Sequence, residues 1–387
     1  MDHVVFVALA DAGVSVLDCE HKTPARSVDG FPYIAIPDIQ DGRVILESTR
    51  KISETDLKMW TRRTTPQPGD VIVTRRGRVG DTAPIPADSR CAIGQNLVLL
   101  RSDGVHVDQG FLRWAVRSPQ WWTEVDRLMN VGAIFSSLNV RDIGQIRLSF
   151  PDLHMQRNIA EVLDALDDKI ADNTKLAKLA DELAVALSSQ AFESGPELPL
   201  MELAEVTMGS SPAGTSLNED GDGTVFYQGI RDFGLRYPER RVWTDEPGRL
   251  AQELDTLLSV RAPVGTTNIA SESMCIGRGL ASIRSRLGTP YTLFHAIRSS
   301  PIWQQFNSEG TVFGSINRKQ LESVHLKWVD SDDLQVFETN LASLERVIRT
   351  ASSTIETLTA TRDALLPQLM SGKLQIKEAE DLVTAAV

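Results

Sequence analysis

The sequence lacks the residue patterns that usually carry catalysis or bind metals. Only three of its 387 residues are cysteines, and Cys19, Cys91 and Cys275 lie far apart with no CxxC spacing. The phosphate-loop motif GxxxxGK[ST], GxGxxG, HExxH and GxSxG are missing, and the six histidines are scattered singly. The sequence therefore predicts no zinc site, no disulfide framework, no metal and no catalytic residue.

Long apolar runs are also missing. No run approaches the ~18 residues that a membrane span requires, and the N-terminus lacks the basic start of a signal peptide. A hydrophobic fraction of 42% with 24% charged residues is typical of globular proteins. We expect a cytoplasmic protein with two or three domains.

Basic residues are in deficit, with 40 Lys+Arg against 52 Asp+Glu and a net charge of −12. This balance at first argues against nucleic acid, because phosphate contact needs positive surface. The deficit is local, however: residues 151–200 and 329–387 carry 9 basic and 20 acidic residues, whereas residues 1–150 and 201–328 carry 31 and 32. The balanced segments are rich in arginine, which binds phosphate and guanine in a bidentate manner.

The chain contains an internal repeat, and each copy is about half the length of the chain. Residues 132–139 (GAIFSSLN) match residues 310–317 (GTVFGSIN), and three further matches keep the same order. These pair 115–118 with 296–299, 93–94 with 276–277, and 70–74 plus 79–80 with 255–259 plus 264–265. Four ordered matches indicate duplication.

Each repeat begins with short β-rich runs and ends in a helical segment. Residues 71–73 and 96–100 predict strands, and residues 110–128 predict a helix broken near Pro119. Segments 159–187 and 337–369 carry apolar residues at 4,3 spacing over about thirty residues, roughly 45 Å, which favours a two-helix coiled coil over packing on one domain. Its predicted core is Ile159, Leu163, Leu166, Ile170, Asn173, Leu344, Ile348, Ile355, Leu358 and Leu365.

The order is therefore domain, helix, domain, helix, with the second helix returning antiparallel to the first. Asn173 either fixes the register of the coiled coil or is a solvent-facing residue. We predict an α+β fold, in which two pseudo-repeated mixed α/β domains are separated by a long antiparallel two-helix coiled-coil spacer. The expected boundaries are 1–150, 151–195 (first spacer helix), 196–328, 329–374 (second spacer helix) and 375–387 (C-terminal tail).

Arginines cluster in the first domain within a window whose only acid is Asp70, and those of the second domain, Arg236 among them, are more diluted with acids. Amide side chains that can recognise adenine follow at the next predicted strand. The alternative is ordinary solvated surface charge. The predicted DNA-binding residues are Arg62, Arg63, Arg75, Arg76, Arg78, Gln95, Asn96, Arg231, Arg240, Arg241, Arg261 and Arg278.

Several motifs together resemble type I restriction–modification specificity subunits over nearly the whole chain. Residues 156–170 (QRNIAEVLDALDDKI) are similar to the start of that family's central helix, and residues 365–374 (LLPQLMSGKL) to its C-terminal ending. Residues 69–80 and 94–97 resemble its recognition-domain core motifs. Two departures stand in the second repeat, where residues 334–338 (LQVFE) replace a Gln-Arg-like junction and residues 260–263 (VRAP) replace the glycine-containing turn of residues 75–78.

The resemblance implies a non-catalytic subunit in which each globular domain is a target recognition domain for one half of a split DNA sequence. Two modification (methyltransferase) subunits and the restriction/translocase subunits would join it. S-adenosylmethionine and ATP/Mg would be bound by those partners, with no cofactor in this chain. The partner-subunit interface would include Gln156, Arg157, Asp167 and Lys169.

Two other classes of protein stay open from the residues alone. One is a coiled-coil protein-interaction scaffold without DNA recognition, which predicts no DNA-dependent activity beside a methyltransferase subunit. The other is a nuclease with a dispersed Asp/Glu site, which predicts metal-dependent activity of the purified chain.

Overall fold

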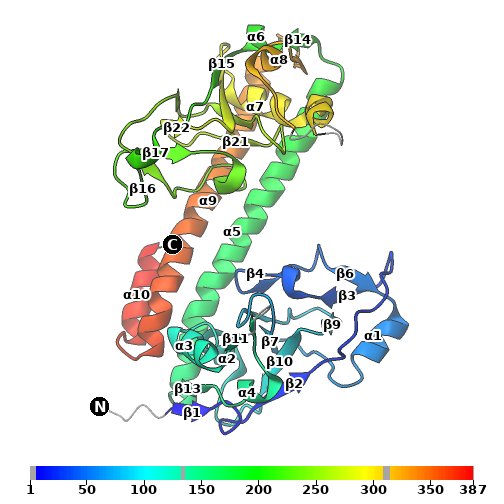
Figure 1. Cartoon of the computed structure of the whole chain (residues 1–387), viewed down its shortest axis with the longest axis vertical. Coiled ribbons are helices and arrows are strands. Elements are labelled where there is room, and N and C mark those ends of the chain that lie inside the picture. The colour runs from blue at the N-terminus through cyan, green and yellow to red at the C-terminus, as the bar shows by residue number, and fades with distance from the viewer. Residues whose placement is uncertain (1–5, 132–135, 308–313, 387) are drawn as a thin grey trace. The chain divides into compact units, whose positions relative to one another are not determined.

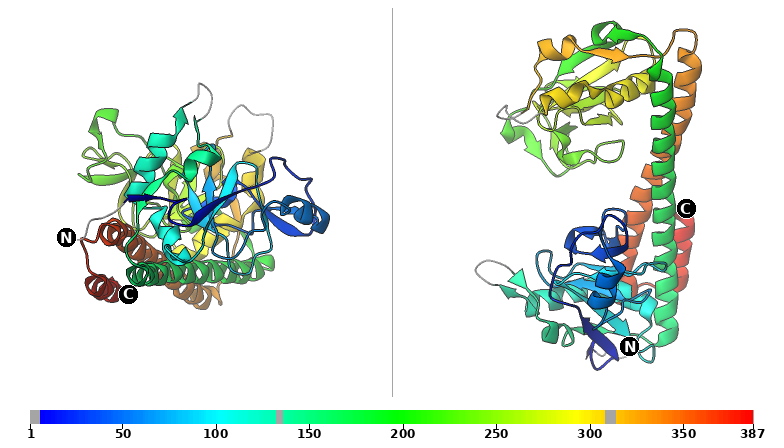
Figure 2. Two further views of the ribbon diagram at one scale, coloured as in Figure 1. Left: turned by 90° about the horizontal axis from the view of Figure 1, so that it is seen from below. Right: turned by 90° about the vertical axis from the view of Figure 1, so that its right-hand side faces the viewer.

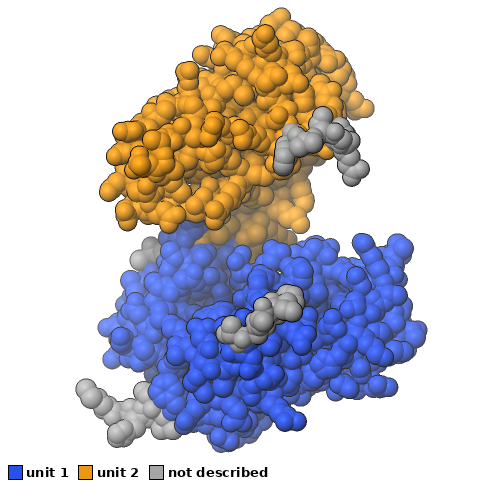
Figure 3. Space-filling model, viewed as in Figure 1, with its two compact units in different colours: residues 1–170, 356–387 blue, residues 171–355 orange. Residues whose placement is uncertain are grey.

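The computed structural model describes residues 6–131, 136–307 and 314–386. It divides into two compact units, which Figure 3 colours separately. Unit 1 contains residues 1–170 and 356–387, and unit 2 contains residues 171–355. Each unit thus combines one globular part with the adjoining portions of two long helices (Figure 1).

Unit 1 is built on a four-stranded antiparallel sheet with the order β2-β10-β7-β8. A second sheet, β6-β3-β9, pairs β3 with β9 in parallel, and β1 pairs with β13. Its strands are β1 (Phe6–Ala8), β2 (Val14–Asp18), β3 (Phe31–Ile34), β4 (Ile39–Gln40), β5 (Arg43–Val44), β6 (Arg50–Ile52), β7 (Val71–Thr74), β8 (Thr82–Pro84), β9 (Ala92–Ile93), β10 (Leu97–Ser102), β11 (Asn130–Val131), β12 (Ser136–Ser137) and β13 (Arg147–Ser149).

Three of the shorter helices of unit 1, which begin at Glu54, Gln109 and Pro119, have side-chain caps. Ser118 caps α3 by accepting a hydrogen bond from the Trp121 amide, and Pro119 occupies the first helical position, where its missing N–H costs nothing. The helix expected over residues 110–128 is therefore two helices that meet at Pro119, as the sequence predicts. The helices are η1 (Ile36–Asp38), α1 (Glu54–Trp60), α2 (Gln109–Ala115), α3 (Pro119–Leu128) and α4 (Val140–Ile143).

Unit 2 has a main antiparallel sheet with the order β15-β23-β20-β21. A second sheet, β16-β18-β17-β22-β19, pairs β17 with β22 in parallel, and β14 pairs with β24. Its strands are β14 (Glu197–Pro199), β15 (Ala204–Met208), β16 (Leu217–Asn218), β17 (Thr224–Tyr227), β18 (Trp243–Thr244), β19 (Leu250–Ala251), β20 (Thr256–Ser259), β21 (Thr267–Ile269), β22 (Met274–Ile276), β23 (Leu280–Ser285) and β24 (His325–Lys327).

The main sheet of each unit packs an apolar face into a core. In unit 2 this core includes Leu258, Ile283 and Trp303, all buried, and in unit 1 Ile72 and Leu99 are fully buried. The strands expected at residues 71–73 and 96–100 are the central strands β7 and β10. The helices of unit 2 are α6 (Leu200–Leu203), η2 (Gly214–Ser216), η3 (Ile230–Asp232), α7 (Pro290–Ser299), η4 (Pro301–Phe306) and α8 (Arg318–Glu322).

Two long helices contribute to both units, α5 (Leu153–Glu193) and α9 (Leu334–Met370). Within each unit a segment of α5 lies beside a segment of α9, as the views of Figure 2 show. Phe192 contacts Phe337 edge to face in unit 2, with ring centroids 5.7 Å apart. A further helix, α10 (Ile376–Ala386), forms in unit 1 where the sequence predicts only a tail.

Parts of the sequence repeat fall outside the described residues, namely 132–135 and 310–313. Its described residues take matching positions, since Asn139 precedes α4 and Asn317 precedes α8 as the N-cap residue. No helix among the described residues is long and apolar enough to cross a membrane.

Candidate nucleic-acid interface

Three turns of unit 1 lie together at the edge of the main sheet where β7 ends and β10 begins. They contain Arg75, Asn96 and Leu138. The Arg75 amide donates to the Asn96 carbonyl (2.8 Å), and the Leu138 amide donates to the Arg75 carbonyl (2.9 Å). Arg76 forms a β-bridge with Ser137. The turns after β7 and β9 are thus fixed side by side, and they carry Arg76 and Gln95 at the surface.

Unit 2 forms the same edge from corresponding residues. The Val260 amide donates to the Gly279 carbonyl (2.9 Å), and the Ile316 amide donates to the Val260 carbonyl (3.0 Å). Arg261 forms the bridge with Ser315. Arg261 therefore takes the position of Arg76, and Arg278 takes that of Gln95. The turns differ locally, because Gly77 has φ +70° whereas the Ala262–Pro263 peptide is cis.

Four of the predicted arginines are exposed and form no side-chain ion pair among the residues that the structure describes. These are Arg76, Arg231, Arg261 and Arg278. Their guanidinium groups keep their donors for an external acceptor. Gln95 is also exposed, and Asn96 is half-buried. These positions form the candidate nucleic-acid interface.

Arg75 and Arg78 are partly engaged inside unit 1. Arg78 donates to the carbonyls of Ile36 (2.6 Å) and Ile39 and lies 3.3 Å from Asp81. Arg75 is half-buried and donates to the Gln95 carbonyl (3.3 Å). Both side chains hold neighbouring turns together, which leaves fewer donors for DNA than the sequence suggests.

Other predicted arginines have carboxylate partners. Arg62 and Arg63 both contact Glu20 (3.2 and 3.4 Å), and Arg240 contacts Glu272 (2.7 Å). Arg241 pairs with the buried Asp232, with its Nε 2.6 Å from Oδ1. These pairs lower the positive potential that the clusters would otherwise present.

The structure corrects the prediction of a second arginine cluster at one residue. Arg236 is buried and is not part of the surface. Its side chain is only 1% exposed and pairs with Asp181 of α5 and Glu345 of α9, the latter at 3.0 Å. Its guanidinium also stacks on the Phe294 ring, 4.5 Å from the centroid. Arg236 therefore attaches the loop between η3 and β18 to the two long helices within unit 2.

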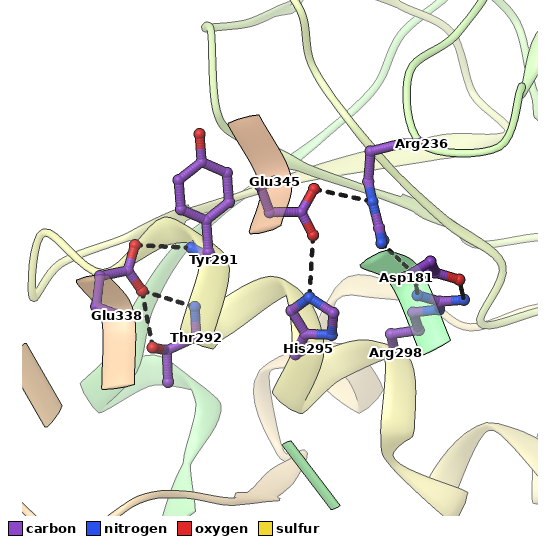
Figure 4. Close-up of polar contacts among 8 residues, drawn as sticks. All are labelled: Asp181, Arg236, Tyr291, Thr292, His295, Arg298, Glu338 and Glu345. Atoms are coloured by element: carbon purple, nitrogen blue, oxygen red, sulfur yellow. Dashed lines mark hydrogen bonds and ion pairs between the residues drawn. The ribbon is translucent and has the colours of Figure 1, made fainter. Parts of the chain in front are cut away.

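Figure 4 shows that this ion pair belongs to a larger polar network, which is buried at Arg236, His295 and Glu345. Arg298 of α7 donates to both oxygens of Asp181 (2.5 and 2.9 Å), and His295 of the same helix contacts Glu345 at 3.0 Å. Burial lowers the pKa of His295 below its usual value, so its imidazole is neutral. Burial alone would raise the pKa of Asp181, but the charges and hydrogen bonds of Arg298 and Arg236 outweigh burial, so the pKa of Asp181 is lowered.

Glu338 holds the start of α7 by accepting hydrogen bonds from the amides of Tyr291 (3.1 Å) and Thr292 (2.8 Å). Gln156 has the same role in unit 1, where its Oε1 accepts from the Asp108 amide (2.7 Å) at the start of α2. Glu338 thus replaces the glutamine of the Gln-Arg-like junction and keeps its contact with the start of the helix. A carboxylate accepts hydrogen bonds from these N–H groups as an amide oxygen does.

In unit 1 the helices and globular part meet at Asp167, whose side chain is 3% exposed. Its carboxylate contacts Arg43 (2.9 Å), Arg113 (2.5 Å) and Arg362 (2.9 Å). Burial would raise the pKa of Asp167, but the three guanidinium groups outweigh it and lower it. Arg362, which interrupts the apolar stripe of α9, is therefore the buried partner of a carboxylate on α5.

Two of the four residues of the predicted partner-subunit interface, Gln156 and Asp167, are buried within unit 1. Gln156 is fully buried, and its amide also donates to the carbonyls of His106 (2.9 Å) and Pro151 (2.7 Å). Asp167 is buried among its arginines. Neither side chain is exposed, whereas Arg157 and Lys169 are.

Most of the predicted spacer core is buried, although Asn173, Leu344 and Ile355 are half-buried. At one position the structure differs from the 4,3 pattern, because Glu345 is fully buried beside Leu344. Arg236 and His295 supply the partners that make this burial possible. The buried residues of the set are Ile159, Leu163, Leu166, Ile170, Ile348, Leu358 and Leu365.

No group of three or more metal-binding side chains occurs among the described residues. The three cysteines are free and buried, and burial raises the pKa of Cys19 and of Cys91 to about 11. These thiols are protonated at neutral pH and are poor nucleophiles.

Known proteins similar to this chain in sequence and in fold include specificity subunits of type I restriction–modification systems. Residues 20–180 match the type I restriction modification DNA specificity domain. The MjaX type I restriction enzyme specificity subunit of Methanocaldococcus jannaschii is 26% identical over 308 residues, which cover 73% of this chain and 72% of that protein. The chain is thus similar to type I restriction–modification specificity subunits.

Solved structures of specificity subunits cover nearly the whole chain. The S subunit from M. genitalium is 16% identical with a TM-score of 0.64, covering 95% of this chain and 97% of that one, which shows a shared fold. The HsdS subunit from Thermoanaerobacter tengcongensis is 22% identical over 94% of this chain and 97% of that one, with a TM-score of 0.36.

Proposed function

We propose that this chain is a non-catalytic DNA-recognition subunit, the specificity subunit of a type I restriction–modification system. It would recognise a split DNA sequence, with the globular part of each unit contacting one half-site. The observation that carries the proposal is the repeated sheet edge, where Arg76 bridges Ser137 in unit 1 and Arg261 bridges Ser315 in unit 2. Two equivalent surfaces with exposed arginines suit two half-sites. Phosphate contacts would supply affinity, and base contacts the sequence choice.

The long helices would act as a spacer that sets the distance between the half-sites. They have 41 and 37 residues, and their contacts within each unit favour the antiparallel coiled coil that the sequence predicts. Their acidic flanks would keep DNA away from the spacer. Under this proposal the recognition domains are residues 1–150 and 196–328, and the spacer helices lie in residues 151–195 and 329–374.

The partners would be double-stranded DNA, two modification subunits and restriction/translocase subunits in the cytoplasm. The exposed Arg157 and Lys169 are the residues of the predicted interface that could meet them. S-adenosylmethionine and ATP/Mg would be bound by the partners. A protein-interaction scaffold without DNA recognition would not require unpaired arginines at the same edge of both units.

Co-expression with the modification subunit of the same system, followed by single-molecule mapping of methylated bases, tests the proposal. We expect one split motif with a fixed gap. Methylation without a split motif, or none that depends on this chain, would contradict it.

Heptad insertion in both long helices tests the spacer. Seven residues lengthen a helix by ~10 Å, and DNA rises 3.4 Å per base pair along each strand, so the gap should grow by about three base pairs. Both half-site sequences should stay the same. An unchanged gap in a folded complex would show that the helices do not set the spacing.

A further inference from the structure

Beside Arg278, the candidate interface of unit 2 contains a glutamine whose backbone is fixed on both sides. Gln228 directly follows β17, and the Gly277 amide donates to the Tyr227 carbonyl (2.8 Å). The Gly279 amide donates to the Gln228 carbonyl (3.1 Å). Gln228 therefore lies against the turn that carries Arg278, and both side chains are exposed.

The Gln228 side chain is held by a chain of hydrogen bonds. The Arg278 amide donates to Ser211 Oγ (3.3 Å), and the Ser211 hydroxyl donates to Gln228 Oε1 (2.7 Å). This relay orients the amide and leaves one lone pair of Oε1 available. Among the described residues, Gln228 Nε2 has no hydrogen-bond partner, so its two N–H donors are available to a ligand.

Gly277 and Gly279, which lie against Gln228 in space, leave room for the hydrogen-bonded conformation of Gln228. A Cβ atom on Gly277 would lie 2.5 Å from Gln228 Oε1 and 2.9 Å from its Cα, so a side chain there would displace the glutamine. A Cβ on Gly279 would lie 2.5 Å from the Gln228 carbonyl oxygen. A side chain held in this way loses less conformational entropy on binding.

The chemistry of the pair matches two purines. In the major groove adenine presents its N6 amino group and the N7 acceptor, which the oxygen and nitrogen of a glutamine amide complement. Guanine presents N7 and O6, which an arginine contacts in a bidentate manner. We propose that Gln228, positioned by Ser211, recognises an adenine beside a guanine that Arg278 contacts in the unit 2 half-site. This inference rests on the proposed function.

Unit 1 lacks this arrangement at the corresponding position. There the Gly94 amide donates to the Ile34 carbonyl (2.8 Å), which places Ala35 where unit 2 has Gln228. Ala35 has no hydrogen-bonding side chain, and Gln95 takes the position of Arg278. The adenine contact of Gln228 therefore distinguishes the half-site of unit 2 from that of unit 1.

The test is methylation mapping with Gln228→Ala in the complete complex. We expect the gap, the first half-site and the other positions of the second half-site to remain unchanged. At one adenine of the second half-site, discrimination should fall by about tenfold to a hundredfold. Ser211→Ala should give a smaller loss at the same position, because it frees the amide without removing it. Gln95→Ala in unit 1 should alter one position of the other half-site, and this change shows which half-site unit 1 contacts.

A matched control lies at the opposite end of β20 from Arg261. Gln252 is also an exposed glutamine bonded to a serine, with its Nε2 3.4 Å from Ser273 Oγ. Gln252→Ala should leave the motif intact. Full discrimination in Gln228→Ala, or an equal loss in Gln252→Ala, would overturn the inference. A wild-type complex without a split motif would instead reject the proposed function.

Discussion

Units 1 and 2 present the same backbone edge with different side chains on it. The turn after β9 presents Gln95 and the turn after β22 presents Arg278, whereas Arg76 and Arg261 are the same residue type at the same position. Where the two edges share arginine, the side chain suits phosphate, which every DNA sequence offers. Where they differ, the side chains suit different bases. Under the proposed function, the comparison would separate affinity from sequence choice.

The units also differ in how they hold the long helices. Unit 1 uses one buried carboxylate, Asp167, among three arginines. Unit 2 uses Asp181 and Glu345 with two arginines and the neutral His295. Trp114, which aligns with His295, donates to Asp164 (2.7 Å) in unit 1. An indole does not titrate, so the pH sensitivity from this position is confined to unit 2.

The largest expected effect is that of Asp167→Ala in unit 1. Three arginines would lose their shared carboxylate, and breaking a buried ion pair in this way costs about 3–5 kcal/mol. Denaturant unfolding should show a loss of this size. The exposed neighbour Asp168 is the control, and Asp168→Ala should change the free energy of unfolding by no more than about 0.5 kcal/mol. Equal effects would show that Asp167 does not anchor the helices.

Gln95→Arg should make the first half-site resemble the second at one position. Adenine would give way to guanine there, because a bidentate base contact supplies about 1–3 kcal/mol of discrimination. Methylation mapping of the complex measures the change. An unaltered first half-site would remove Gln95 from the set of base contacts.

His295→Gln should flatten the pH dependence of unit 2. Because burial lowers the pKa of His295 below 6.5, the unfolded chain binds a proton that the folded chain does not. The free energy of unfolding therefore falls as the pH drops below about 6.5. Thermal unfolding between pH 7 and pH 5 should show a shallower decline for this variant than for the wild type. His325→Gln, at an exposed site, should retain the wild-type slope.

The smallest expected effects are those of Arg76→Ala and Arg261→Ala, which should be similar to each other. Each would remove a proposed phosphate contact, so the dependence of log affinity on log salt should weaken by about one unit while the methylated motif stays the same. Binding titrations of the complex at several salt concentrations measure this. A changed motif in either variant would place that arginine on a base.

Sequence reasoning identifies the features that depend on local pattern. The 4,3 spacing predicts the long helices, the ordered matches predict duplication, and Pro119 predicts the break between α2 and α3. It fails where a charged residue is buried. Glu345 lies beside the predicted core residue Leu344, and Asp167 resembles a surface acid, because the partners of both come from distant segments.

The sequence by itself determined the order of β-rich and helical segments, the confinement of excess acid to the helical segments, and the resemblance to specificity subunits. Only the tertiary structure decided which arginines are exposed, since Arg236 is buried and Arg261 is not. It also brought Ser211, Gln228 and Arg278 together from three separate segments. Periodicity records which face of an element is apolar, whereas the partner of a polar side chain depends on how distant segments meet.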